Sequence, residues 1–294
     1  IDSVGLVTAR NGIEIGARPG VAASISVDGN MIVSGITTLG SDAIINGVTV
    51  GKGANSVNTN TAIGVNALDA SVTGVDNTAI GSGSLTDLTT GADNTGVGRL
   101  SLADLTTGSH NTAIGCESLD ALSTGDHNTG LGKAALGSIT TASDNTAVGS
   151  GAAGSTTGSN NTAVGRSSLN ANTTGERNTA VGTRSLENQT TGTLNTAYGY
   201  ESGQANNATG ITAIGYKALE ANTTANYNTA IGYEALKNNT TGGVNGPNVA
   251  VGKYALLANT TGDNNVAIAA LGSNTTGSDN TGVGAAALGS NTTG

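Results

Sequence analysis

The chain has 294 residues, with 47 Gly, 6 Tyr, no Phe and no Trp, and its formal net charge is −9. With so few large apolar side chains it cannot build a thick globular core, and 36% hydrophobic against 11% charged residues argues against disorder. The acidic balance argues against nucleic acid as a partner. No apolar run approaches the roughly 18 residues of a membrane span, so we expect no membrane insertion.

Residues 1–57 carry no long repeat. Apolar and polar residues alternate in places, as around Ile13 and Ile15, and Asp28-Gly29-Asn30 has the composition of a hairpin turn. We therefore predict a short β-rich neck or connector over residues 1–57, separate from the rest of the chain.

From residue 58 to residue 294 the chain repeats itself. The pentad Asn-Thr-Ala-Ile-Gly and its variants occur 14 times, mostly 17 residues apart. The spacing slips to 20 at one insertion and to 15 at a deletion near Ala269. A fixed period with slips confined to turns is typical of a solenoid. The sequence therefore predicts an all-β fold, a parallel β-solenoid or β-roll of about fourteen 17-residue coils over residues 58–294.

Each pentad is predicted to be a short strand, whose side chains alternate between two faces. The fourth position is apolar in every copy, and in most copies a Leu follows four residues after the pentad. We predict that the fourth position points into the coil and meets this Leu across a narrow core. The predicted core residues are Ile63, Ile80, Ile114, Val148, Val181, Ile231, Leu68, Leu85 and Leu119.

The third position of the pentad is Ala or Gly in all 14 copies. On this assignment it points away from the coil, and a strip of small residues lets another backbone approach closely. We interpret the strip as the interface of a homotrimer; the alternative is that small residues merely suit tight turns. The predicted interface residues are Ala62, Ala79, Gly81, Ala113, Ala163, Ala180 and Ala230.

The residue before each Thr-Thr turn changes along the chain. It is aliphatic in early coils, as at Leu88 and Ile139, and an amide in later ones, as at Asn172 and Asn239. Stacked amides can hydrogen-bond along a solenoid as a ladder. The alternative is a solvent-facing turn that tolerates both residue types.

No catalytic motif is present, and we expect neither enzymatic activity nor a cofactor. His110 and His127 lie one repeat apart, in a column that also holds Asp93. Imidazole and carboxylate groups are common metal ligands, so these three residues are weak candidates for a metal site. The alternative is a solvated turn column, and we expect no metal.

The pentad, followed by Ser/Ala-Leu and Thr-Thr-Gly, resembles the left-handed parallel β-roll repeats of trimeric autotransporter adhesin heads. Its 17-residue period is more similar to repeats in bacteriophage tail fibres, notably those of marine cyanophages, and the run from Thr8 to Gly20 is also similar to cyanophage structural proteins. The resemblance implies a homotrimer that binds a host surface.

Three functions therefore stay open. The first is the structural rod of a phage tail fibre on the virion, used in host attachment, with identical chains, other virion or fibre proteins and a host receptor or glycan as partners. The second is a bacterial surface adhesin head. The third is an ice-binding solenoid, because Thr fills the second pentad position in 12 of 14 copies. The predicted alternation turns these Thr side chains inward, which argues against ice binding.

Overall fold

The computed structural model describes residues 42–45, 48–240 and 246–294. The chain divides into two units between Gly40 and Ser41. The hairpin turn predicted at Asp28-Gly29-Asn30 therefore lies outside the described residues, and the description that follows concerns the second unit.

The described residues form a single 16-stranded sheet whose strands follow one another in chain order. They contain no α-helix, only one short 3-10 turn, η1 (Ala54–Ser56). The strands are β1 (Ala43–Ile45), β2 (Val48–Gly51), β3 (Thr61–Gly64), β4 (Thr78–Ile80), β5 (Thr95–Val97), β6 (Thr112–Ile114), β7 (Thr129–Leu131), β8 (Thr146–Val148), β9 (Thr162–Val164), β10 (Thr179–Val181), β11 (Thr196–Tyr198), β12 (Thr212–Ile214), β13 (Thr229–Ile231), β14 (Val249–Val251), β15 (Val266–Ile268) and β16 (Thr281–Val283).

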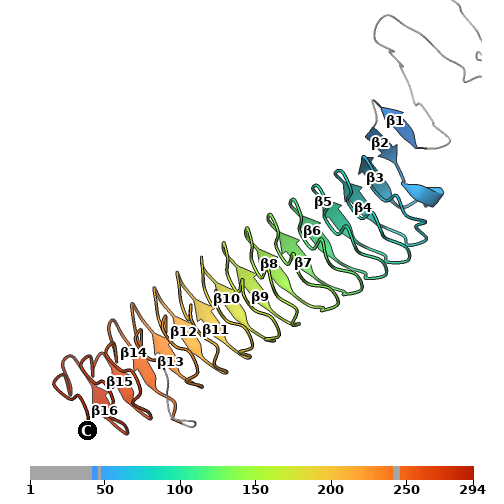
Figure 1. Cartoon of the computed structure of the whole chain (residues 1–294). Helices are drawn as coiled ribbons and strands as arrows, with labels where there is room; N and C mark the ends of the chain where they lie inside the picture. Colours follow the sequence, from blue (N-terminus) through green and yellow to red (C-terminus); the bar gives the residue numbers. More distant parts are fainter. Residues whose placement is uncertain (1–41, 46–47, 241–245) are drawn as a thin grey trace, which may run out of the picture. The chain divides into compact units, whose positions relative to one another are not determined.

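Strands β3 to β16 are the repeated pentads, and every neighbouring pair among them is parallel. The register preserves the repeat, with Thr61 opposite Thr78 and Ala62 opposite Ala79. Fourteen parallel strands are joined by 13 steps, so the stack holds about 13 coils (Figure 1). This confirms the predicted parallel β-solenoid.

The start of the solenoid is covered by an antiparallel hairpin. Strand β1 pairs with β2, and β2 pairs antiparallel with β3, the first repeated strand. The Asp42 carboxylate accepts hydrogen bonds from the backbone N–H groups of Lys52 and Gly53, each at 2.7 Å. The described part of the predicted neck therefore extends the solenoid sheet, and the hairpin shields an edge that other strands could otherwise join.

The two faces of each strand are the reverse of those predicted. The third pentad position lies inside the coil, with no exposure at Ala62, Ala79, Ala113, Ala163, Ala180 and Ala230. The fourth position faces outward: Ile63, Ile80, Ile114 and Ile231 are 37–40% exposed, and Val148 and Val181 are half-buried. The predictions that these Ala form an interface between chains and that these Ile and Val form the core are therefore wrong.

The reason is the width of the coil. Leu68, Leu85 and Leu119 are fully buried, as predicted, and they meet the strand from the opposite side. The pentad Asn is also inside, with Asn94 and Asn111 fully buried. With Leu and Asn in place, the remaining interior accommodates a methyl group rather than a branched side chain, because protein interiors are close-packed.

Gly81, predicted to lie at the trimer interface, allows close contact between neighbouring coils of one chain. Its φ is +135°. A Cβ atom placed on it would lie 2.3 Å from the carbonyl oxygen of Gly98 in the next coil. Neither the backbone angle nor this space suits a larger residue.

Two ladders of buried amides run along the inside of the coils. In the pentad ladder, the Oδ1 atom of Asn77 accepts from the backbone N–H of Asn94 at 3.0 Å and from its Nδ2 at 3.1 Å. The second ladder confirms the stacking predicted for the column before Thr-Thr: Asn239 donates from Nδ2 to Oδ1 of Asn222 at 3.0 Å. Both columns are buried, which excludes the solvent-facing alternative.

The second ladder begins at a defect. The same column is filled by Leu122 and Ile139 in earlier coils, and the change to amides passes through Thr156 and Asn172. Within the described residues, Thr156 Oγ1 and Asn172 Oδ1 are buried without a hydrogen-bond partner. An orphaned buried polar atom costs stability.

Candidate functional surfaces

The outward face of the parallel sheet is the largest repeated surface, and we name it the Thr–Ile face. It consists of the second and fourth pentad positions of strands β3 to β16, none of which is fully buried. The second position is Thr except at Val249 and Val266, and the fourth is aliphatic except at Tyr198. One large apolar side chain per coil therefore faces outward along the whole stack.

The size of this face can be worked out from strand geometry. Thirteen steps of about 4.8 Å give a length of about 62 Å, and two columns about 6.6 Å apart give a width of about 10 Å. The face therefore has an area of about 600 Å², shared between the apolar column and the Thr column. A standard protein interface buries about 800 Å² on each partner, so this face is close to the size that supports association.

A second surface gathers the tyrosines of the chain. All six Tyr lie between residues 198 and 254. Four of them, which we name the tyrosine edge, are Tyr200, Tyr216, Tyr233 and Tyr254, each 40–44% exposed. The rings of Tyr200 and Tyr216 stack at 5.6 Å, those of Tyr216 and Tyr233 at 5.0 Å, and Tyr254 meets Tyr233 edge to face at 5.5 Å.

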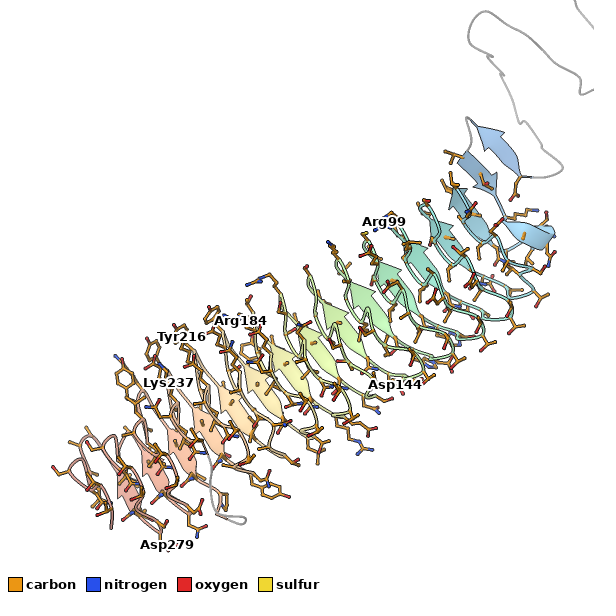
Figure 2. All side chains as sticks on the ribbon, viewed as in Figure 1. Arg99, Asp144, Arg184, Tyr216, Lys237 and Asp279 are labelled. Carbon is orange, nitrogen blue, oxygen red and sulfur yellow. The ribbon has the colours of Figure 1, made fainter. Side chains whose placement is uncertain are left out.

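A chain of ion pairs accompanies the tyrosine edge. Arg184 bonds to Glu187 and to Glu201 at 2.7 Å each, and Lys217 joins Glu201 at 3.0 Å. Hydrogen bonds to Glu220 and Glu201 raise the pKa of Lys217. Lys237 extends the chain by bridging Glu220 at 3.6 Å and Glu234 at 3.0 Å. Figure 2 places Arg184, Tyr216 and Lys237 along one edge of the stack, and Asp144 and Asp279 along the other.

The tyrosine edge ends at a hollow, which we name the slot. In the regular coils, the backbone N–H of Leu236 donates to the carbonyl oxygen of Ala255 at 3.0 Å. One coil later, the backbone N–H of Leu256 donates to the carbonyl oxygen of Ala270 at 3.3 Å. Ala270 thus takes the place of Ala255, and the shortened coil has no counterparts of Lys253 and Tyr254. The resulting cavity of about 260 Å³ is lined by Lys253, Tyr254, Ala269, Ala270, Leu271, Gly272, Ala286 and Gly289.

The histidine column does not assemble a metal site. The rings of His110 and His127 stack with their centroids 4.9 Å apart, and Nδ1 of His110 lies 3.7 Å from Oδ2 of Asp93. Across the described residues, no group of three or more His, Cys, Asp or Glu side chains is placed to hold a metal ion.

Sequence reasoning missed both the tyrosine edge and the slot, although each left a signal. The crowding of all six Tyr into residues 198–254 pointed to the edge, and the 15-residue spacing near Ala269 pointed to the slot.

In the part of the chain that the structure describes, no helix is long and apolar enough to span a membrane. Comparisons with protein-family models, curated proteins and solved structures found no match for this chain.

Proposed function

We propose that the protein is the rod of a homotrimeric fibre of the bacteriophage tail-fibre type, with a structural role in host attachment and no catalytic role. The observation that carries the proposal is the Thr–Ile face. One chain leaves an apolar side chain of every coil in contact with water, and burial of such a surface favours association.

We infer three copies around a common axis, because the pentad resembles the repeats of trimeric adhesin heads and of phage tail fibres. Each coil presents nearly the same residues, so equivalent coils of identical chains can meet at the same height, as closed symmetry requires. Because the face is flat and continuous, the association would extend along the whole rod. A bacterial surface adhesin head, the alternative, would use the same face and differ in whether the rod is mounted on a virion or on a cell.

A second candidate, ice binding, is favoured by one observation. The pentad Thr side chains point outward rather than inward, as at Thr61 and Thr146, which are exposed on the outward face of the sheet. The two functions compete for one surface, because a trimer that covers the Thr–Ile face leaves no Thr array for ice.

The proposal is tested by native mass measurement of the purified chain and of Ile114→Lys. Ile114 is 40% exposed, so the single chain should tolerate lysine there, whereas three lysines inside a trimer would repel one another. We expect a wild-type trimer and a folded I114K variant whose trimer dissociates at lower temperature or at higher protein concentration than the wild type. Thr107→Lys, an exposed turn variant, should behave like the wild type. A wild-type monomer, or an I114K trimer as stable as the wild-type trimer, contradicts the proposal.

Two further measurements separate the alternatives. Electron microscopy of purified particles would show the rod on a virion for a tail fibre and on a cell for an adhesin. Thermal hysteresis in a monomeric sample would favour ice binding, and its absence would exclude it.

A further inference from the structure

The slot has the dimensions of a site for one six-membered ring. Neighbouring strands lie about 4.8 Å apart, so the coils on either side of the missing pair are about 9.6 Å apart at that edge. After the thickness of the walls is subtracted, one six-membered ring fits between Tyr254 on one side and Ala286 and Gly289 on the other. The volume of about 260 Å³ lies just below the usual range for drug-sized ligands.

A cation at the slot is available for an anionic group. The Nζ atom of Lys253 lies 4.7 Å from the ring centroid of Tyr254 and 5.8 Å from that of Tyr233. Lys217 and Lys237 are each held by two carboxylates, whereas Lys253 has no ion pair among the described residues. Lys253 is exposed, so its ammonium is accessible to a ligand carboxylate, which it would bind through charge-assisted hydrogen bonds.

The backbone adds an acceptor at the same place. In the preceding coils, the carbonyls of Tyr216 and Tyr233 accept from the backbone N–H groups of Glu234 and Tyr254 at 2.9 and 3.0 Å. The equivalent donor for the Lys253 carbonyl is one of the two missing residues, and no backbone N–H within the described residues replaces it. This oxygen can therefore accept from a ligand hydroxyl.

We propose that the slot binds a carboxylate-bearing pyranose, a sugar of the uronic-acid class, and that the tyrosine edge contacts the following sugars of the same glycan. A pyranose combines the required groups: an apolar C–H face for Tyr254, hydroxyls for the Lys253 carbonyl and a carboxylate for its ammonium. The inference rests on the attachment function proposed above and names its receptor class.

The tyrosine edge extends the site in the direction of the rod. Tyr233, Tyr216 and Tyr200 each present an exposed ring border at successive coils. The ion pairs beside them nearly balance one another, since the three cations Arg184, Lys217 and Lys237 face four carboxylates, which leaves a net charge of −1; the carboxylates are those of Glu187, Glu201, Glu220 and Glu234. A linear glycan can thus lie along the edge without strong repulsion, and the specificity for an acidic unit is set at the slot.

The test is isothermal titration of the full chain with an alginate tetrasaccharide, built of uronic acids, and with cellotetraose, a neutral glycan of equal length. We expect the alginate to bind more tightly, and Lys253→Gln to weaken its binding about tenfold, the loss typical of one charge-assisted bond. Lys133→Gln, an exposed lysine at the same position of an earlier coil, is the matched control and should change nothing.

A second variant tests the slot itself. Insertion of two alanines between Ala269 and Ala270 restores the 17-residue period, and it should fill the hollow and abolish binding while the fold persists. Failure of both glycans to bind, equal binding by K253Q, or binding by the insertion variant would overturn the proposal. Native mass measured on the same samples separates the two ideas: an intact trimer without glycan binding refutes the slot alone, and a monomer refutes the fibre.

Discussion

Thr156→Val should make the protein more stable. Thr156 has no exposure, and its Oγ1 atom has no hydrogen-bond partner. It follows Ile139 in the same column, and Val72 already fills that column in the first coil. An unsatisfied buried polar group costs about 1–3 kcal/mol, whereas valine has nearly the same shape and no polar atom. We take the lower end, because neighbouring coils can relax around the hydroxyl.

A gain of about 1 kcal/mol corresponds to a rise in Tm of about 2–4 °C for a domain of this size. Thermal unfolding followed by circular dichroism measures it, with Thr140→Val as the control. Thr140 is exposed, so loss of its hydroxyl should leave Tm within error. If T156V melts at or below the wild-type temperature, the unpaired Thr156 hydroxyl does not lower the stability of the fold, and the reasoning is refuted.

Three other variants test separate features. Gly115→Ala should prevent stable folding, because the new Cβ would lie 2.5 Å from the carbonyl oxygen of Gly132; soluble expression and circular dichroism check this. Ala113→Leu should lower the free energy of unfolding of the single chain by about 1–3 kcal/mol, because the larger side chain overpacks the coil interior. Urea unfolding of samples too dilute to associate measures this loss. Burial alone would raise the pKa of Glu201, but hydrogen bonds from Lys217 and Tyr200 outweigh it and the pKa lies below its ordinary value. The Glu201 ion pairs therefore stabilise the fold above about pH 4.3 and lose that effect as the pH falls further. The Tm of Glu201→Gln should fall less on acidification than that of the wild type. An equal fall would contradict the stabilising role of the Glu201 ion pairs.

The period and the position of each strand could be predicted from the sequence, because the pentad is short, regular and rich in β-branched residues. The identity of the inner face could not be predicted from hydrophobicity. Alternation defines two faces without saying which one is enclosed, and Ile is the more apolar residue. The variability of side-chain size distinguishes the two faces. The third position never holds a side chain larger than that of Ala, whereas the fourth holds Tyr198 as well as Val97. Only an outward position accommodates such a range in so narrow a coil.

The 15-residue spacing near Ala269 signals the location of the slot, but its lining residues could not be predicted from the sequence, for a different reason. The slot is made by residues that are missing, and its walls come from coils on either side of the gap. Lys253 and Ala286 are 33 residues apart in the sequence, and only the stacking brings them to one cavity. The amide ladder, by contrast, was predictable because equal residues one period apart must lie above one another.

The hydrogen bonds between coils run along the rod, and this determines how the molecule carries a pulling force. The backbone N–H of Thr95 donates to the carbonyl oxygen of Asn111 in the next coil at 2.8 Å, and similar hydrogen bonds join each coil to its neighbours. A tension along the axis therefore acts on the coils in series, and the coil with the fewest bonds opens first. The shortened coil after Lys253 lacks the bonds that Glu234 and Tyr254 make in the coils before it. A stretched rod should yield there, one coil at a time, while the earlier coils stay paired.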